Sequence, residues 1–306
     1  MKYDVVIIGG GAAGLSSAVY SQRAMLKTVV VEQEYMGTGQ IAESPRVDNY
    51  LGFFGLDGAE LGDKFRSHAE ALGTEFLNDE VTEIISLESS NGYKIKPSEG
   101  DVLETKTVIF SAGCKRKNLG IKGEKEFSAR GISFCAVCDG AFYKNKTAAV
   151  IGAGDTAFSD ALYLANIASK VYIIARRDKF RAGNSLVDAA KKRGNIEILT
   201  NTVPIEFTGE KSVDGIILNA NGNEKKLAVN GIFIAVGSVP NTALLSGIAK
   251  LDESGYVVAD EDGVTSAAGI FAAGDVRTKR LRQVITAAAD GANCAVSAEK
   301  YIRENF

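Results

Sequence analysis

The sequence predicts an α/β protein that contains two Rossmann-like βαβ units, and three observations support this fold class. The chain has 306 residues, enough for two domains of ordinary size. Short β-branched runs alternate with segments of helical spacing, which is the pattern of parallel strands connected by helices. Glycine-rich turns directly follow two of these runs, at Gly9 and at Gly152.

The first βαβ unit opens the sequence. Asp4–Ile8 and Thr28–Val31 are expected strands, and Leu15–Ala24 has the spacing of a helix. The turn Gly9–Gly14 reads G-x-G-x-x-G, in which glycines allow a tight turn and let the backbone approach a pyrophosphate. Glu32 lies about 20 residues further on, where a carboxylate accepts a hydrogen bond from a ribose hydroxyl. The unit therefore predicts a dinucleotide site.

A Cys-x-x-Cys motif lies between the two glycine turns, at Cys135 and Cys138. Two interpretations are open: half of a zinc site, or a redox dithiol whose thiol pKa the motif lowers. A zinc site needs two more ligands, and only Cys114, Cys294 and His68 are available as soft ligands, scattered along the chain. We therefore expect a redox pair, no metal, and packing roles for the other two cysteines.

The second βαβ unit repeats the first. Ala148–Ile151 and Lys170–Ile174 are expected strands, Gly152–Ala157 is the glycine turn, and Phe158–Asn166 is the helix. Two dinucleotide sites in one chain imply two dinucleotides, and a hydride passing between them is the economical explanation. The unit therefore favours an oxidoreductase.

The two units differ where the nucleotide is selected. Ala175 replaces the acid found at Glu32, and Arg176, Arg177 and Arg181 follow it. Without the acid, a 2′-phosphate is no longer repelled, and arginines offer it bidentate donors. The second site therefore favours NADPH over NADH, with a solvated basic turn as the alternative.

Composition narrows the possible functions. A net charge of −3 argues against nucleic acid as the main partner, which would require a strongly basic face. A single histidine excludes zinc sites built on several imidazoles and disfavours a Ser-His-Asp triad. No apolar run reaches the length of a secretory core or of a membrane-spanning helix. We expect a cytoplasmic protein without membrane or nucleic-acid partners.

The C-terminal part contains a third expected strand, Gly269–Ala273, and a long closing helix, Val284–Tyr301. The strand ends in Gly274-Asp275, a common turn that says little alone. A basic stretch follows it, with Arg277, Lys279, Arg280 and Arg282, which is either a solvated loop or a docking surface for an acidic protein.

Together these motifs resemble the low-molecular-weight thioredoxin reductases, a branch of the flavoproteins with two dinucleotide-binding domains. The resemblance covers about residues 1–302, and its most specific element is Cys135–Gly140. Thr38, Val137 and Ala175 depart from the family pattern. Further matches are Gly39-Gln40, Val47–Asn49, Ser111–Gly113, Arg176–Arg181, Pro240–Thr242, Phe271–Asp275 and Arg282-Gln283.

The resemblance implies an FAD domain split into residues 1–115 and 246–306, with an NADPH domain at 116–245 inserted between them and carrying the Cys-x-x-Cys motif. It implies a homodimer that passes electrons from NADPH through FAD and Cys135–Cys138 to thioredoxin or a thioredoxin-like protein. Cys138 would face the flavin and Cys135 would attack the substrate. Rotation of the inserted domain, with hinges near 115–118 and 241–246, would let nicotinamide and dithiol reach one flavin in turn.

The resemblance also implies cofactor-binding residues. For FAD they are Gly9, Gly11, Ala12, Ala13, Gly14, Glu32, Gln33, Gly39, Gln40, Asn49, Val81, Ala112, Gly113, Gly274, Asp275, Arg282, Gln283 and Val284. For NADPH they are Gly152, Gly154, Asp155, Thr156, Ala157, Arg176, Arg177, Arg181, Val236 and Gly237.

The proton-transfer group is expected to be Asp139. His68 lies in the polar segment 63–71, remote in sequence from every motif, and is expected to be an exposed helical residue. Asp139 adjoins the dithiol, and burial there would raise its pKa toward the working pH. Three rival functions stay open: the same enzyme with ferredoxin or NADH as donor, a flavin NAD(P)H oxidase or ferredoxin–NADP reductase, and a non-catalytic zinc-stabilised binding protein.

Overall fold

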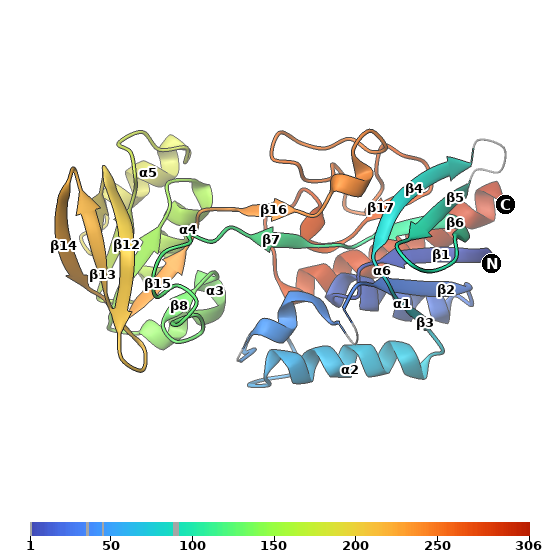
Figure 1. Ribbon diagram of the computed structural model, residues 1–306, viewed down its shortest axis with the longest axis horizontal. Coiled ribbons are helices and arrows are strands. Elements are labelled where there is room, and N and C mark those ends of the chain that lie inside the picture. The colour runs from blue at the N-terminus through green and yellow to red at the C-terminus, as the bar shows by residue number, and fades with distance from the viewer. Residues whose placement is uncertain (1, 35–36, 45, 88–91) are drawn as a thin grey trace. The chain divides into compact units, whose positions relative to one another are not determined.

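The structure, a computed structural model, describes residues 2–34, 37–44, 46–87 and 92–306. The chain forms two compact units (Figure 1). Unit 1 comprises Met1–Lys115 and Val239–Phe306, and unit 2 comprises Arg116–Ser238. Unit 2 is therefore inserted within the sequence of unit 1.

Unit 1 is built on a seven-stranded sheet of order β3-β2-β1-β6-β5-β4, in which β17 also pairs with β6. The pairs that involve β1, β2, β3 and β17 are parallel, whereas β4 and β5 add an antiparallel hairpin. The strands are β1 Lys2–Ile8, β2 Thr28–Glu32, β3 Glu75–Asn78, β4 Val81–Leu87, β5 Gly92–Pro97, β6 Leu103–Phe110 and β17 Ile270–Ala272. The helices are α1 Ala12–Arg23, α2 Gly58–Ala71 and α6 Val284–Asn305, with 3-10 turns at Gly39–Glu43, Ala243–Leu245 and Gly274–Val276.

The apolar residues of β1 alternate between two cores, one on each face of this sheet. Val6 and Ile8 belong to one core, and Val5 and Ile7 belong to the other. The alternation follows from the two-residue period of a strand. Because both faces are covered, the strand reads as an unbroken apolar run. Helices α1 and α6 supply much of the second core.

Unit 2 contains a five-stranded parallel sheet of order β11-β10-β9-β15-β8 and a three-stranded antiparallel sheet, β12-β13-β14 (Figure 1). The strands are β8 Ile132–Ser133, β9 Thr147–Ile151, β10 Lys170–Ile174, β11 Ile196–Leu199, β12 Thr202–Gly209, β13 Val213–Ala220, β14 Asn223–Ala228 and β15 Gly231–Ile234. The helices are α3 Ala136–Asp139, α4 Asp155–Leu164 and α5 Asn184–Lys191, with a 3-10 turn at Gly140–Tyr143.

The predicted α/β class with two Rossmann-like units is confirmed, with small differences at element ends. Both helices that follow a glycine turn begin three residues earlier than expected, at Ala12 and Asp155, each with a glycine as N-cap. The last residues of each glycine motif therefore already form the first helical turn. The C-terminal strand, whose sheet the sequence did not decide, pairs with β6 of unit 1.

The chain crosses between the units through two short strands that pair with each other, β7 (Cys114–Arg116) and β16 (Ser238–Pro240). The return crossing falls after Ser238, whereas the sequence placed it at residues 245–246. The difference arises because Asn241 already bonds unit 1, donating through Nδ2 to the Ala112 carbonyl at 2.7 Å. Leu245 is likewise buried in a core of unit 1.

No helix in the described parts of the chain is both long enough and apolar enough to cross a membrane.

Candidate active site

The first glycine turn requires glycine at two places. Gly9 has a φ of +105°, and a Cβ there would lie 2.5 Å from the Ser111 carbonyl oxygen. A Cβ on Gly14 would collide with the Gly9 carbonyl oxygen and lie 2.9 Å from Ser111 Oγ. Strand, turn and helix therefore pack closely, as the dinucleotide motif demands.

Glu32 is the last residue of β2, and its side chain contacts this turn. Its Oε2 accepts a hydrogen bond from the Gly10 amide at 2.5 Å, and its Oε1 accepts one from the Glu34 amide at 3.2 Å. The carboxylate thus lies beside the glycine turn, where a ribose hydroxyl would meet it.

Two segments from distant parts of the sequence meet the N-terminal end of α1. A Cβ on Gly39 would lie 2.9 Å from the Cα of Gly11, and a Cβ on Gly274 would lie 2.9 Å from the Cβ of Ala13. This convergence makes a backbone-lined cradle at a helix N-terminus, the arrangement that favours phosphate groups. The residues expected to hold FAD therefore fit that group.

A second cluster of expected FAD residues forms around the start of α6. Asn49 Nδ2 donates to Gln283 Oε1 at 2.8 Å, which joins the 47–49 segment to the helix. The Arg282 guanidinium lies 4.2 Å from the centre of the Tyr256 ring. Among described residues, buried Arg282 Nε has no hydrogen-bond partner, so it is a donor that suits an acceptor-rich ligand.

The other expected FAD residues are dispersed around this cradle. Gln40 donates through Nε2 to the Cys114 carbonyl, and Ala112 and Gly113 accept bonds from Asn241. The Val81 side chain is buried in the core, so only its backbone is available to a ligand, and Gln33 is exposed.

A buried ion cluster supports the Gly274 turn, and sequence reasoning missed it. Asp290 of α6 accepts from the Gly274 amide at 2.9 Å and from Lys279 Nζ at 2.7 Å, and Arg277 Nη1 lies 3.4 Å away. Arg277 and Asp290 are 4% and 6% exposed. The interpretation of the basic stretch as a solvated loop or docking surface is therefore wrong for Arg277 and Lys279, because both pair internally with Asp290, thirteen and eleven residues further on.

In unit 2 the second glycine turn has the same tight packing. A Cβ on Gly152 would lie 2.3 Å from the Ala235 carbonyl, whereas a Cβ on Gly154, the N-cap of α4, would meet nothing within 4 Å. The backbone at Gly154 is thus accessible to a phosphate. Val236 and Gly237 follow β15 next to this turn, since Ala235 bonds to Ile151.

The arginine segment is tied to that turn. The Arg181 and Ala182 amides both donate to the Ala153 carbonyl, at 2.9 and 3.2 Å. The Gly183 amide donates to Asp155 Oδ1 at 2.8 Å. Exposed Arg176, Arg177 and Arg181 are therefore held close to the phosphate-binding turn, and the residues expected to hold NADPH fit it. Thr156 is exposed and Ala157 is buried in the first turn of α4.

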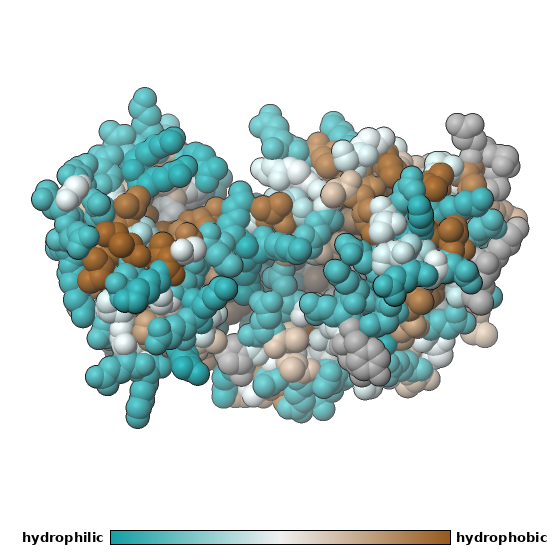
Figure 2. Space-filling model, viewed as in Figure 1, coloured by the Kyte–Doolittle hydropathy of each residue, from teal (hydrophilic) through white to brown (hydrophobic). Residues whose placement is uncertain are grey.

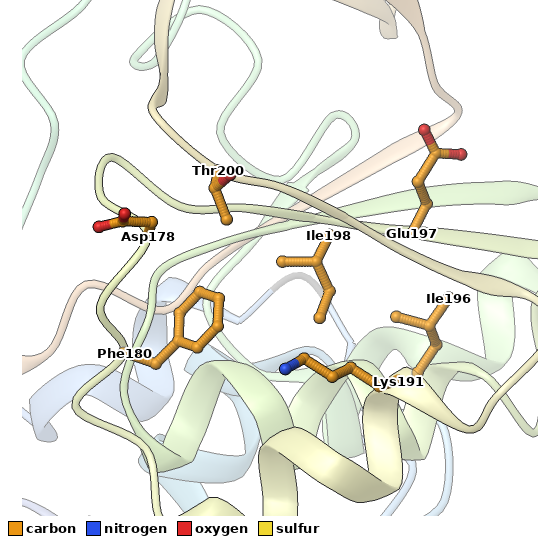
Figure 3. Close-up of a pocket in the computed structure, with 7 residues that line it drawn as sticks. All are labelled: Asp178, Phe180, Lys191, Ile196, Glu197, Ile198 and Thr200. Atoms are coloured by element: carbon orange, nitrogen blue, oxygen red, sulfur yellow. The ribbon is translucent and has the colours of Figure 1, made fainter.

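A shallow cavity of about 490 Å³ lies beside this segment (Figure 3). Asp178 and Phe180 line it together with Lys191 and with Ile196, Glu197, Ile198 and Thr200 from and after strand β11. None of the three arginines lines it. The cavity is therefore a feature of the sheet edge and not of the dinucleotide site.

Cys135 and Cys138 form a disulfide at the start of α3. Cys135 is the N-cap of this helical turn, and its Sγ accepts from the Cys138 amide at 3.1 Å. Both cysteines are half-buried, whereas Val137 between them is 43% exposed. Both sulfurs of the motif are therefore in the disulfide, whereas Cys114 and Cys294 lie outside it and are buried. In the described parts of the chain, no group of three His, Cys, Asp or Glu residues is placed to hold a metal ion.

Asp139 ends α3 beside the disulfide. Its Oδ2 accepts from Ser133 Oγ at 2.6 Å, and the charge of Arg116 acts on it. Burial nevertheless raises the pKa of Asp139, against the lowering effects of Ser133 and Arg116. His68 is an exposed residue of α2, as expected.

The sequence reasoning missed a second half-buried acid of unit 2, Asp160. Burial raises the pKa of Asp160, on α4, to about 7. No signal in the sequence indicated the burial of Asp160. Its neighbour Ser159 is exposed, but consecutive residues of α4 point in different directions, so the two side chains have different environments.

Comparisons with known proteins agree with this geometry. The family model described as pyridine nucleotide-disulphide oxidoreductase matches residues 3–291. The chain is 40% identical over 305 residues to a protein named thioredoxin reductase from Listeria monocytogenes, covering 99% of this chain and 94% of that one. Thioredoxin reductase from Streptococcus pyogenes matches with a TM-score of 0.92 and 34% identity over 99% of both chains. Lactococcus lactis thioredoxin reductase in its FR conformation matches with a TM-score of 0.66 and 39% identity, again over 99% of both.

Figure 2 shows a largely hydrophilic face with scattered apolar patches.

Proposed function

The chain belongs to the thioredoxin reductases within the pyridine nucleotide-disulphide oxidoreductase family. From this premise we propose which residues bind each cofactor and which carry out each step of the reaction. The protein is a thioredoxin-disulfide reductase, a flavoprotein that uses FAD and NADPH. The observation that supports this assignment is the Cys135–Cys138 disulfide, which adjoins the half-buried Asp139 in the unit that also carries the arginine segment.

Unit 1 is the FAD domain. The cradle formed by Gly11, Gly39 and Gly274 receives the pyrophosphate, and Glu32 accepts from the ribose. Asp275, in the 3-10 turn Gly274–Val276, and Arg282, directly before the N-cap of α6, would contact the remaining part of the cofactor. Bound there, FAD would supply the two-electron chemistry that links hydride transfer from NADPH to reduction of the disulfide.

Unit 2 is the NADPH domain. The helix N-terminus at Gly154 receives the pyrophosphate, and Arg176, Arg177 and Arg181 bind the 2′-phosphate. Anaerobic mixing with NADPH, NADH and reduced ferredoxin, followed by flavin absorbance, tests the donor. NADPH is expected to bleach the flavin fastest, and faster bleaching by either alternative would refute this assignment.

The dithiol carries electrons to thioredoxin by disulfide exchange. Two electrons and two protons convert the Cys135–Cys138 bond into two thiols, and each thiol loses its proton to solvent before it attacks as a thiolate. The Cys135 thiolate attacks one sulfur of the thioredoxin disulfide, which breaks that bond and releases a thiolate. The Cys138 thiolate then attacks Cys135 Sγ, which restores the Cys135–Cys138 bond and releases reduced thioredoxin. Cys138→Ser should abolish thioredoxin turnover, and persistent turnover would favour a flavin oxidase or ferredoxin–NADP reductase.

Asp139 supplies the proton in this exchange. It adjoins Cys138, and burial raises its pKa, which is the direction that a general acid requires. Asp139→Asn is expected to slow disulfide reduction by roughly 10²-fold, while flavin reduction by NADPH stays fast. Unchanged thiol turnover would refute the role.

Unit 2 carries both the dithiol and the NADPH segment, yet each must reach the flavin of unit 1. Rotation about the paired strands β7 and β16 satisfies both needs. Two solved thioredoxin reductases cover this chain equally but differ in TM-score, which supports more than one arrangement within the family. A cross-link between the units should stop steady-state turnover, and normal turnover of the cross-linked protein would refute the proposed rotation.

Homodimer assembly and a cytoplasmic location complete the proposal, both on family grounds. Sedimentation of the purified holoenzyme and fractionation of the source cells test them. A monomeric mass, or recovery outside the cytoplasmic fraction, would contradict them.

A further inference from the structure

Ser133 connects the backbone of the dithiol to Asp139. It ends strand β8 and is 5% exposed. Its Oγ lies 2.6 Å from Asp139 Oδ2, 3.0 Å from the Cys135 amide nitrogen and 3.3 Å from the Cys135 carbonyl oxygen. One buried hydroxyl therefore contacts both the general acid and the backbone of the attacking cysteine.

The direction of the hydroxyl proton follows from these partners. The Cys135 amide can only donate, so it occupies a lone pair of Ser133 Oγ. The single hydroxyl proton then points either to the Asp139 carboxylate or to the Cys135 carbonyl. The shorter, charge-assisted bond to Asp139 is preferred while that carboxylate is ionised. When Asp139 is protonated it becomes a donor, and the Ser133 proton can turn to the Cys135 carbonyl.

We propose that Ser133 is a positioning residue for Asp139, whose hydroxyl holds the carboxyl group beside the dithiol and turns its proton as Asp139 gains or loses one. The proposal rests on the proposed acid role of Asp139. It adds that the strand β8 residue keeps the acid hydrogen-bonded in both of its protonation states, so that neither state leaves a buried polar group unsatisfied.

Other groups around Asp139 cannot replace this contact. Arg116 acts on it through charge, and its exposed guanidinium stacks 5.1 Å from the centre of the Phe134 ring. Burial and, to a smaller extent, the Asp139 charge raise the pKa of Tyr143, so this phenol stays protonated at working pH. Helix α4 packs on α3, and neither Asp160 nor Tyr163 of α4 is among the causes of the Asp139 pKa shift.

The test compares Ser133→Ala with the matched pair Ser133→Thr and Ser133→Val, which share a shape but differ in the hydroxyl. Ser169→Ala, which removes an exposed hydroxyl of unit 2, is the control. The titration of the Asp139 carboxyl carbon is followed by NMR in ¹³C-aspartate-labelled oxidised holoenzyme, with Asp139→Asn identifying the signal. Thioredoxin reduction is measured against pH, and flavin reduction by NADPH separately.

Ser133→Ala and Ser133→Val should raise the pKa of Asp139, because they remove a bond to its ionised form. They should lower kcat for thioredoxin by roughly 10- to 100-fold, with a smaller change in KM and unchanged flavin reduction. Ser133→Thr and Ser169→Ala should match the unmodified protein. The Thr and Val pair stays decisive even if Ser133→Ala does not fold.

Equal Asp139 titrations for Thr and Val at position 133 would overturn the inference. If the titrations are equal and Asp139→Asn is inactive, the positioning role of Ser133 is refuted while the acid role of Asp139 stands. If Asp139→Asn turns over normally, the acid role fails, whereas a titration difference between Thr and Val would still establish the hydrogen bond.

Discussion

The buried cluster around Asp290 gives the sharpest stability prediction. Asp290→Ala would leave Arg277, 4% exposed, and the Lys279 ammonium without their buried counter-charge, and would remove the acceptor of the Gly274 amide. Breaking a buried pair in this way costs about 3–5 kcal/mol, because an uncompensated charge stays in the interior. We therefore expect the free energy of unfolding of unit 1 to fall by about that amount.

Glu261→Gln is a matched control on the same arginine. The Glu261 carboxylate lies 3.9 Å from Arg277 Nη2, but its side chain is 92% exposed. Water screens such a pair, so its loss should cost about 0–1 kcal/mol. The two acids share Arg277 but differ in burial and in their other partners, since Asp290 also binds Lys279 and the Gly274 amide, so Glu261→Gln should cost much less than Asp290→Ala.

The assay is urea unfolding of the holoenzyme, with flavin fluorescence reporting unit 1 and far-ultraviolet circular dichroism reporting the whole chain, since a chain of two units need not unfold in one step. Flavin release at lower urea for Asp290→Ala than for Glu261→Gln is expected. Arg277→Met added to Asp290→Ala should recover part of the loss, because it removes the unpaired charge. Equal effects of Asp290→Ala and Glu261→Gln would refute the reasoning.

Three further predictions test other parts of the structure. Gly14→Ala places a Cβ against the Gly9 carbonyl, so the free energy of unfolding of unit 1 should fall by about 1–3 kcal/mol and flavin should be lost on dialysis. In the control Gly194→Ala the new Cβ meets nothing within 4 Å, so stability and flavin should both be retained. Equal flavin retention by the two variants would contradict the packing argument. Arg181→Ala should raise KM for NADPH by roughly 10- to 100-fold through loss of a charge-assisted phosphate contact, with little change for NADH, and parallel changes for both nucleotides in steady-state kinetics would exclude a 2′-phosphate role. Burial raises the pKa of Asp160 from 3.8 to about 7, so the folded state binds its proton more tightly than the unfolded state and stability declines as pH rises from about 4 to 7. Asp160→Asn should therefore stabilise the protein by up to about 4 kcal/mol at pH 8 and leave it nearly unchanged at pH 4, and a pH-independent effect in urea unfolding would count against the burial argument.

The candidate site divides into a part that local sequence predicts and a part that it does not. Both glycine turns, the strands before them and the helices after them follow from local rules, because only glycine fits the backbone at Gly9 and Gly152. Cys135, Cys138 and Asp139 are close together in the sequence, so one short helical turn brings them together.

Contacts between distant segments follow no local pattern. The approach of Gly39 to Gly11, the pairing of β17 with β6 and the bond from Ser133 to Asp139 each depend on how elements pack. Likewise, Arg277 and Lys279 belong to a basic stretch typical of a surface, but they form an internal ion cluster because their counter-charge, Asp290, lies on α6.

The sequence by itself thus determined the fold class, the two nucleotide-binding turns and the redox pair, since glycine geometry and thiol chemistry act over a few residues. Only the tertiary structure decided which charges are buried, which hydroxyl holds the acid and where the chain passes between its units. Those features depend on desolvation and on packing between elements, which a linear pattern does not encode.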